Sequence, residues 1–265
     1  MKLAIQENRM PGATLTERVA LAEDMGFEGM EFWGADIGER IPEIVKAFAG
    51  RKIKPCTVCA GYEGALICAD PKDRAAAREG ILQRLRIAGD LGMVGIIVVP
   101  GFQRHKSIPD LLPFKTSREL ETEVLVAQLQ EMAPEAEKTG AAILLEPLNR
   151  YEAHYLNRQM DAVELCKRVG SPSVQVICDF FHMNIEEYNT PETLRQVGTY
   201  CKHVHLADNT RQEPGSGSID FKAGFAALKQ IGFAGYMAFE CGISDPNNQE
   251  GCLRKSVECL RTCMG

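Results

Sequence analysis

The chain has 265 residues, of which 45% are hydrophobic and 25% are charged, as in an ordinary globular protein. Its formal net charge of −6 argues against binding to a phosphate backbone, which requires a concentrated basic surface. No apolar run approaches the roughly 20 residues that cross a bilayer, and the first apolar stretch is too short for a secretory signal. We therefore expect a cytoplasmic protein without a nucleic-acid partner or a membrane association.

Strand-like and helix-like segments alternate from one end of the chain to the other. The predicted strands are 2–6, 29–34, 54–61, 95–101, 141–149, 174–182, 202–209 and 235–242. The predicted helices begin near Thr14 and continue with approximately 41–50, 71–91, 117–138, 158–169, 191–200, 220–231 and 248–263. Strict alternation of eight strands with eight helices predicts a (β/α)8 TIM barrel that occupies residues 1–265 as a single domain. A doubly wound open sheet is the alternative, but no glycine-rich phosphate-binding sequence follows the first strand.

Two longer irregular stretches, 61–70 and 101–115, both follow predicted strands. In a barrel such loops lie on the catalytic face, where they can form a lid. The ten cysteines are scattered, and Cys56-Thr-Val-Cys59 has no second pair at zinc-site spacing. We interpret them as reduced residues of the core.

Charged or imidazole side chains stand at the ends of the last four predicted strands. In chain order they are Glu146, Asp179, His205 and Glu240. Burying an unpaired carboxylate is unfavourable, and the carboxyl ends of barrel strands meet at one mouth. We therefore interpret these residues as the ligands of one divalent metal ion. Taken singly, each of them could instead cap a loop or form an ion pair.

Three oxygen-donor residues and one imidazole suit a hard or borderline divalent cation. Mn²⁺ fits this donor set best, with Mg²⁺, Co²⁺ and Zn²⁺ as alternatives. The coordination positions that the protein leaves open would then receive substrate oxygens or water.

Four short motifs surround these residues. They are Glu146-Pro-Leu-Asn-Arg150-Tyr-Glu152, Asp179-Phe-Phe-His182-Met-Asn, His203-Val-His205-Leu-Ala-Asp and Phe239-Glu240-Cys. In their order along the chain they resemble the xylose-isomerase-like TIM-barrel superfamily, and within it the sugar isomerases and epimerases of the ketose 3-epimerase and hydroxypyruvate isomerase types. The segment 205–221 departs from the tagatose-type epimerases and is more similar to the hydroxypyruvate isomerases, so the substrate stays open.

The resemblance implies a role for each motif residue. Glu146, Asp179, His205 and Glu240 would be the metal ligands, and Glu146 and Glu240 would also act as the acid/base pair. Glu152, His182 and Arg211 match the positions that hold hydroxyl or carbonyl oxygens of the substrate.

Other residues are singled out by position alone. Glu31 and Trp33 end the second strand, and Trp33 either stacks on a sugar face or packs in the core. Arg150 is placed to orient Glu146 through a charged hydrogen bond. His182 is expected in the loop after its strand. His203 shares the face of His205 one layer deeper, so we expect it to support the site without ligating.

The resemblance implies a metal-dependent isomerase or epimerase that acts on a small ketose or keto-acid. Proton removal next to a carbonyl gives an enediolate, which a divalent cation stabilises. Two carboxylates on opposite faces of this intermediate give epimerisation, whereas one carboxylate that moves the proton between adjacent carbons gives isomerisation. If a β-leaving group departs instead, the enzyme is a lyase, either a dehydratase or an enzyme that cleaves C-glycosides.

Two further classes fit the sequence less well. Abasic-site endonucleases share this barrel, but their sites need more histidines than the five present here, and the acidic charge opposes DNA. A binding module without catalysis is disfavoured by the intact Glu/Asp/His/Glu set. Members of the superfamily are often dimers or tetramers, so we expect a homo-oligomer.

Overall fold

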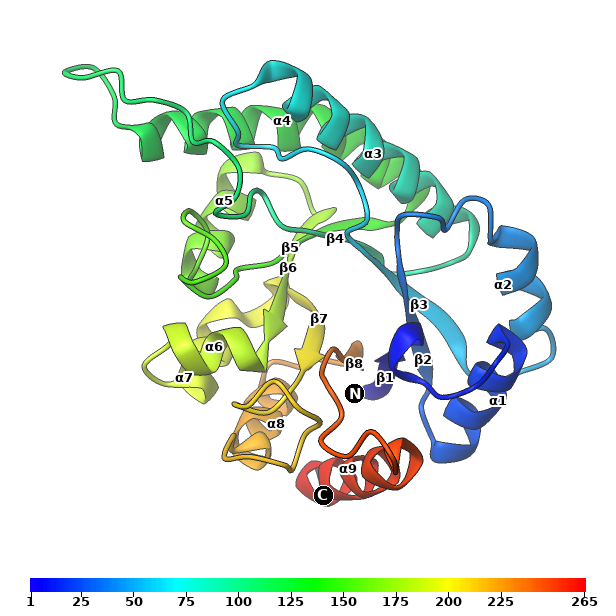
Figure 1. Ribbon diagram of the computed structural model, residues 1–265. Coiled ribbons are helices and arrows are strands. Elements are labelled where there is room, and N and C mark those ends of the chain that lie inside the picture. Colours follow the sequence, from blue (N-terminus) through cyan, green and yellow to red (C-terminus); the bar gives the residue numbers. More distant parts are fainter.

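Eight parallel strands close into a barrel at the centre of the molecule (Figure 1). The computed structural model describes all residues, 1–265. The strands are β1 (Lys2–Gln6), β2 (Gly29–Trp33), β3 (Lys54–Cys59), β4 (Gly95–Val98), β5 (Ala142–Leu145), β6 (Val174–Asp179), β7 (Cys201–Leu206) and β8 (Tyr236–Phe239). Each strand pairs with its neighbours in sequence, and β8 pairs in parallel with β1 to close the ring. The predicted (β/α)8 TIM barrel is confirmed.

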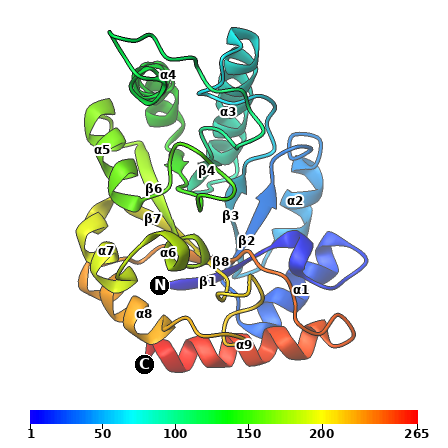
Figure 2. The same cartoon turned by 60° about the vertical axis from the view of Figure 1, so that its left-hand side comes forward.

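The α-helices surround this barrel. They are α1 (Leu15–Met25), α2 (Ile41–Phe48), α3 (Pro71–Asp90), α4 (Ser117–Thr139), α5 (Gln159–Val169), α6 (Phe180–Glu186), α7 (Thr190–Val197), α8 (Phe221–Gln230) and α9 (Gln249–Met264). Figure 2 shows α9 lying across the outside of the barrel, where it contacts both α1 and α8 and so brings the two ends of the chain together. No α-helix combines the length and the apolar character that a bilayer crossing requires.

One helix was not expected. The alternation predicts eight helices, but α6 begins directly after β6 without an intervening loop. The carboxylate of Asp179 makes this possible, because Oδ1 accepts the backbone N–H groups of Phe181 (2.6 Å) and His182 (3.1 Å) and so caps the first turn. The first helix, in contrast, begins as expected, since Thr14 and Glu17 form a reciprocal capping box.

Alternation of side chains along the strands divides the barrel into an inner and an outer layer. Leu3 and Ile5 face the helices, where they join the main hydrophobic core, while Ala4 packs inside the barrel against Cys56 and Ala238. A second apolar cluster fills the interior between β3 and β6, and consists of Cys59, Ile97, Ala142, Leu144 and Ile177. The remaining interior, towards the carboxyl ends of the strands, is polar.

The two long loops that we expect to form a lid, 61–70 and 101–115, lie against each other. Cys68 and Ser107 form an antiparallel bridge, and the amide of Ala69 donates to the carbonyl of Lys106 (2.7 Å). Beyond this contact, residues 107–116 project from the body of the protein as a narrow extension, which we call the arm (green, upper left in Figure 1).

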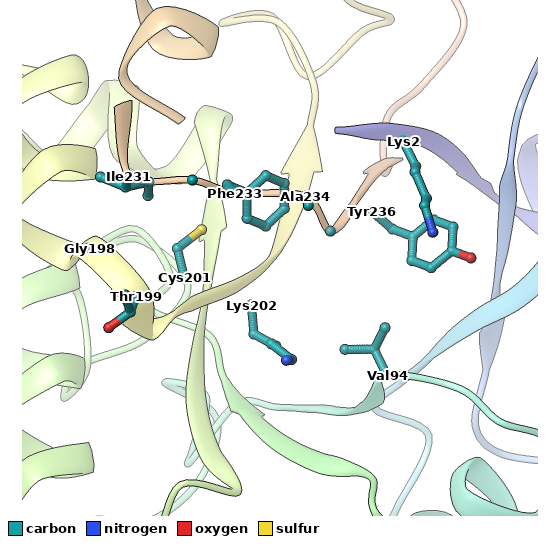
Figure 3. A pocket seen from close by; sticks show the side chains of 12 residues that line it. Lys2, Val94, Gly198, Thr199, Cys201, Lys202, Ile231, Phe233, Ala234 and Tyr236 are labelled. Atoms are coloured by element: carbon teal, nitrogen blue, oxygen red, sulfur yellow. The ribbon is translucent and has the colours of Figure 1, made fainter. Parts of the chain in front are cut away.

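The opposite end of the barrel holds a cavity of about 460 Å³ (Figure 3). Lys2, Lys202 and Tyr236 contribute to its walls, and the Lys2 ammonium lies 5.0 Å from the centre of the Tyr236 ring. No acidic side chain and no histidine lines this cavity. It therefore offers no carboxylate or imidazole ligand for a divalent cation, and the candidate ligands lie at the other end of the barrel.

A buried arginine ties the loops after β2 and β3 to the helical layer. Arg84 of α3 is only 8% exposed, and its guanidinium donates to the carbonyl oxygens of Gly34 (3.0 Å), Gly61 (2.5 Å) and Gly80 (3.0 Å). Gly61 has a φ of +75°, and a Cβ there would meet backbone atoms of residues 34 and 35 within 2.6 Å, so only glycine allows this close approach.

We predict that Arg84→Met destabilises the protein by about 3 kcal/mol, because buried carbonyl groups lose a charged donor. Urea unfolding followed by circular dichroism measures this change. Arg86→Met, on the same helix, is the matched control: Arg86 forms only an exposed ion pair with Glu135, so its loss should be much smaller. Equal losses for the two variants would contradict the role given to Arg84.

Candidate active site

Four strand ends bring the expected ligand residues together at the mouth of the barrel. Glu146 directly follows β5, Asp179 ends β6, His205 lies in β7, and Glu240 directly follows β8. Nδ1 of His205 lies 3.2 Å from Glu146 Oε1, 3.3 Å from Glu240 Oε2 and 3.8 Å from Asp179 Oδ2. One potential ligand atom from each residue falls within 4.8 Å of all the others. The convergence predicted from the strand ends is thus present.

The bonding of Asp179 tests whether this group of residues fits a cation. Its Oδ1 caps α6, whereas its Oδ2 is buried and has no hydrogen-bond partner. A buried carboxylate oxygen without a partner is unfavourable. A divalent cation among the four side chains would satisfy this oxygen, and three carboxylates with an imidazole suit such an ion. The residues therefore fit the metal that their pattern indicates.

The two glutamates of the group differ in their electrostatic surroundings. Burial alone would raise the pKa of Glu240, but the charges of His205 and Arg211 outweigh it and hold the pKa at about 2. Burial raises the pKa of Glu146 above its ordinary value, although His205 opposes the shift. A cation bound between them would lower the pKa of each carboxyl group.

A buried carboxylate lies directly beneath this group. Glu31 of β2 is fully buried, and its oxygens lie 3.0 Å from Nε2 of His203 and 2.9 Å from Nε2 of His205. His203 therefore lies one layer deeper than His205, against Glu31 and outside the four-residue group, as its position two residues before His205 predicts. The bonding of Glu31 itself was not foreseen, because the sequence places it only at the end of a strand.

Arg211 and His182 face the same side of the group. Nη2 of Arg211 donates to Glu240 Oε2 (2.7 Å), and its Nη1 lies 3.0 Å from Nε2 of His182. The guanidinium also lies over the ring of Phe181, 4.5 Å from its centre. Arg211 holds this place with a φ of +59°, a conformation that is uncommon for a residue other than glycine and that the surrounding contacts must stabilise.

Asn149 links Glu152 to His182, although the sequence analysis did not single Asn149 out. The Asn149 side-chain amide donates to Glu152 Oε1 (2.7 Å) and lies 2.9 Å from Nδ1 of His182. The backbone amide of Asn149 also donates to that Nδ1 (3.1 Å). The signal was present in the sequence, because Asn149 belongs to the same motif as Glu146 and Glu152.

Two positional expectations are wrong. His182 lies in α6 and not in a loop, because the cap by Asp179 starts the helix directly after the strand. Arg150 does not orient Glu146: its backbone amide (2.7 Å), Nε (2.9 Å) and Nη2 (2.9 Å) all donate to Glu186. Burial opposes the lowering of the pKa of Glu186, but these hydrogen bonds prevail.

Trp33 is 54% exposed at the end of β2, so it is not a core residue, and stacking on a sugar stays a prediction.

Comparison with known proteins decides the family. A family model described as "Xylose isomerase-like TIM barrel" matches residues 19–263. The chain belongs to this family. It is 31% identical to the 3-dehydro-D-guloside 4-epimerase of Escherichia coli over 99% of the chain and 100% of that protein. A crystal structure of a 3-keto-D-glucoside 4-epimerase from E. coli, also 31% identical, superposes with a TM-score of 0.90 over 99% of this chain and 100% of that one.

A further relative is the D-psicose 3-epimerase of Enterocloster bolteae. It is 36% identical over 115 residues, which are 43% of this chain and 38% of that protein. The named relatives of this barrel are thus epimerases of different sugars. The chain is an enzyme that acts as an epimerase.

We predict that excess Mn²⁺ raises the midpoint of thermal unfolding. A ligand at 100 times its dissociation constant stabilises the native state by about 2.7 kcal/mol, which corresponds to roughly 5–10 °C for a chain of this size. Asp179→Asn should lose most of this shift, because an amide can keep the cap on α6 but is a poor ligand at the Oδ2 position.

Glu152→Gln serves as the control, since Glu152 lies outside the four-residue group and should leave the shift intact. Differential scanning fluorimetry with Mn²⁺, Mg²⁺, Co²⁺ and Zn²⁺ in turn measures the effect. A wild-type protein whose midpoint does not respond to any of the four ions would contradict the metal site.

Proposed function

We propose that this protein is a divalent-metal-dependent epimerase that inverts the carbon next to the carbonyl of a keto sugar. It would act as a single-domain cytoplasmic enzyme through an enediolate of the substrate, with Glu146 and Glu240 as the acid/base pair. Mn²⁺ is the proposed ion, held by Glu146, Asp179, His205 and Glu240. The observation that carries the proposal is the convergence of these four side chains around an oxygen of Asp179 that has no partner.

The names of the relatives point to one kind of chemistry. A 4-epimerase of a 3-keto sugar and a 3-epimerase of a 2-ketose both invert a carbon that adjoins a carbonyl group. Hydrogen on such a carbon is acidic because the carbonyl accepts the charge that develops when the proton leaves. A lyase reaction on the same scaffold has no support among these relatives.

Two carboxylates flank the place where a sugar would lie. Glu146 and Glu240 come from β5 and β8, which are separated in the ring by β6 and β7. One carboxylate, in its ionised form, would remove the proton from one face of the carbon, and the other, in its protonated form, would donate its proton to the opposite face. A bound divalent cation would stabilise the negative charge that develops on the substrate oxygens between these steps.

His182 and Arg211 are placed to hold a substrate oxygen. The backbone amide of Asn149 can only donate, so Nδ1 of His182 accepts and Nε2 carries the proton in the neutral ring. Arg211 also only donates, so its Nη1, 3.0 Å from Nε2, faces a second N–H group, and neither donor has an acceptor at this contact. An acceptor oxygen of the substrate, either carbonyl or hydroxyl, would satisfy both.

Hydrogen exchange in D₂O tests the proposed reaction. With Mn²⁺ present, we expect one carbon-bound hydrogen next to the carbonyl to exchange and the inverted sugar to form. The panel contains 3-keto glycosides, 2-ketohexoses and hydroxypyruvate, and NMR spectroscopy identifies the exchanging carbon. Glu146→Gln and Glu240→Gln should each slow epimerisation at least about 100-fold, the contribution of a positioned acid or base.

The residual exchange distinguishes the two glutamates. Because they serve opposite faces, each variant should retain slow exchange with only one of the two epimers, and the two variants should differ in which one. Epimerisation at the wild-type rate in either variant would contradict the assigned pair. Loss of water from the substrate without inversion would identify a lyase instead.

We also propose that the protein is a homo-oligomer in which the arm contacts a second copy. Leu111, Leu112 and Phe114 on the arm are 58%, 67% and 83% exposed, and exposed apolar groups on a projecting segment are typical of an interface. The arm itself carries one acidic and one basic residue, Asp110 and Lys115, but Arg104 and Lys106 lie at its base, whereas the chain as a whole is acidic. These two basic residues complement the charge of a second copy.

We predict that the double variant Leu112→Asp with Phe114→Asp dissociates the oligomer without unfolding the barrel. Light scattering coupled to size-exclusion chromatography measures the molecular mass. Val45→Asp, which changes an exposed apolar residue of α2 away from the arm, should leave the mass unchanged. A wild-type mass equal to that of one chain would overturn this proposal, and so would a double variant with the oligomeric mass of the wild type.

A further inference from the structure

Glu31 forms hydrogen bonds with side chains from three other strands. Its Oε1 accepts from Gln6 Nε2 (2.9 Å) and faces Nε2 of His205 (2.9 Å). Its Oε2 accepts from the Thr57 hydroxyl (2.7 Å) and faces Nε2 of His203 (3.0 Å). The carboxylate is fully buried at the level of the barrel just below the four-residue group. Every oxygen of Glu31 is thus occupied, in contrast to Oδ2 of Asp179.

These contacts decide which nitrogen of His205 keeps its proton when a cation binds. A carboxylate only accepts, so Nε2 of His205 must carry its hydrogen where it faces Glu31, and Nδ1 carries one where it faces Glu146 and Glu240 without a cation. A cation among the four side chains would displace the hydrogen of Nδ1 and leave the lone pair of the ring on that nitrogen. Nδ1 is also the nitrogen that lies 3.2 Å from Glu146 and 3.3 Å from Glu240. The bond to Glu31 therefore directs the lone pair of His205 into the four-residue group.

Gln6 connects Glu31 to the proposed base. Its side-chain amide nitrogen donates both to Glu31 Oε1 (2.9 Å) and to Glu240 Oε1 (3.1 Å). Gln6 ends β1, and it is only 7% exposed. Strands β1, β2 and β3 contribute no ligand to the group, yet they fix two of its four members through this network.

We propose that Glu31 is a positioning residue that holds His205 in the tautomer and ring orientation needed to ligate a divalent cation through Nδ1. This inference rests on the metal site of the proposed function. Buried carboxylates that accept the second N–H of a ligating histidine tune metal affinity in this way.

Glu31, His203 and His205 also lie close enough together to be considered as a second metal site. The hydrogen bonds argue against it. Both oxygens of Glu31 already have two partners each, and the two histidine nitrogens that face it must carry protons, which leaves no lone pair for an ion. The expected stoichiometry is therefore one ion for each chain.

Metal affinity measured with Mn²⁺ alone tests this role without any substrate. We expect Glu31→Gln to weaken binding roughly 10-fold and Glu31→Leu roughly 100-fold, the range found when such supporting groups are removed. The glutamine variant keeps a neutral acceptor for His205, whereas the leucine variant has none. Isothermal titration calorimetry gives both the affinity and the stoichiometry.

Thr57→Val is the matched control. It removes one hydrogen bond to Glu31 but leaves the contact between Glu31 and His205, so its affinity for Mn²⁺ should stay close to that of the wild type. If Glu31 only contributed to stability, the glutamine and valine variants would bind the ion equally well. Circular dichroism identifies any variant that fails to fold.

The tautomer is also visible in the unaltered protein. Long-range ¹H–¹⁵N correlation spectra of the ¹⁵N-labelled, Zn²⁺-loaded chain should show His205 with a proton on Nε2 and none on Nδ1, which holds even if the Glu31 variants do not fold. A proton on Nδ1, or wild-type affinity in both Glu31 variants, would overturn the positioning role. A wild-type chain that binds no ion would instead refute the metal site of the proposed function.

Discussion

Three carboxylates gather around one imidazole nitrogen inside a closed barrel, and the rest of the account depends on this arrangement. Closure of the ring forces the carboxyl ends of β5 to β8 to converge, so Glu146, Asp179 and Glu240 cannot move apart. Buried like charges repel each other, and their removal from water is unfavourable. His205 and Arg211 compensate part of this charge, but one oxygen of Asp179 has no partner. A divalent cation would relieve the remaining imbalance.

The two halves of the barrel contribute different residues to the candidate site. The ends of strands β5 to β8 provide the four-residue group, whereas Gln6, Glu31 and Thr57 from β1, β2 and β3 form the hydrogen-bonded layer beneath it. Side chains on strands are held more rigidly than side chains on loops, which suits groups that must keep a fixed geometry. Arg211, a proposed substrate contact, lies in the loop after β7 and keeps its strained backbone there through its contacts with Glu240 and His182.

The predictable part of this structure follows from patterns that are local in sequence. Apolar runs that end in Glu146, Asp179 and Glu240 locate both the strands and the site, because parallel strands leave no other place for their carboxyl ends. The start of α6 was missed because it lies within the apolar run 174–182, where the cap by Asp179 has no separate signal. The partner of Arg150 was missed because Glu186 lies 36 residues away.

The hydrogen bonds of Glu31 could not be predicted from the sequence for a different reason. It depends on the register between β2 and β3, which shifts between Met30 and Glu31 and brings Thr57 opposite Glu31. Such an irregularity has no counterpart in the alternation of apolar residues, so sequence reasoning placed Glu31 at a strand end without a role.

A crystal structure of the protein grown with Mn²⁺, with anomalous diffraction data collected at the manganese edge, tests the metal site most directly. We expect a single peak for each chain, within about 2.0–2.4 Å of a carboxylate oxygen of Glu146, Asp179 and Glu240 and of Nδ1 of His205. A peak at another place, or a well-ordered site without a peak at saturating Mn²⁺, would contradict the account.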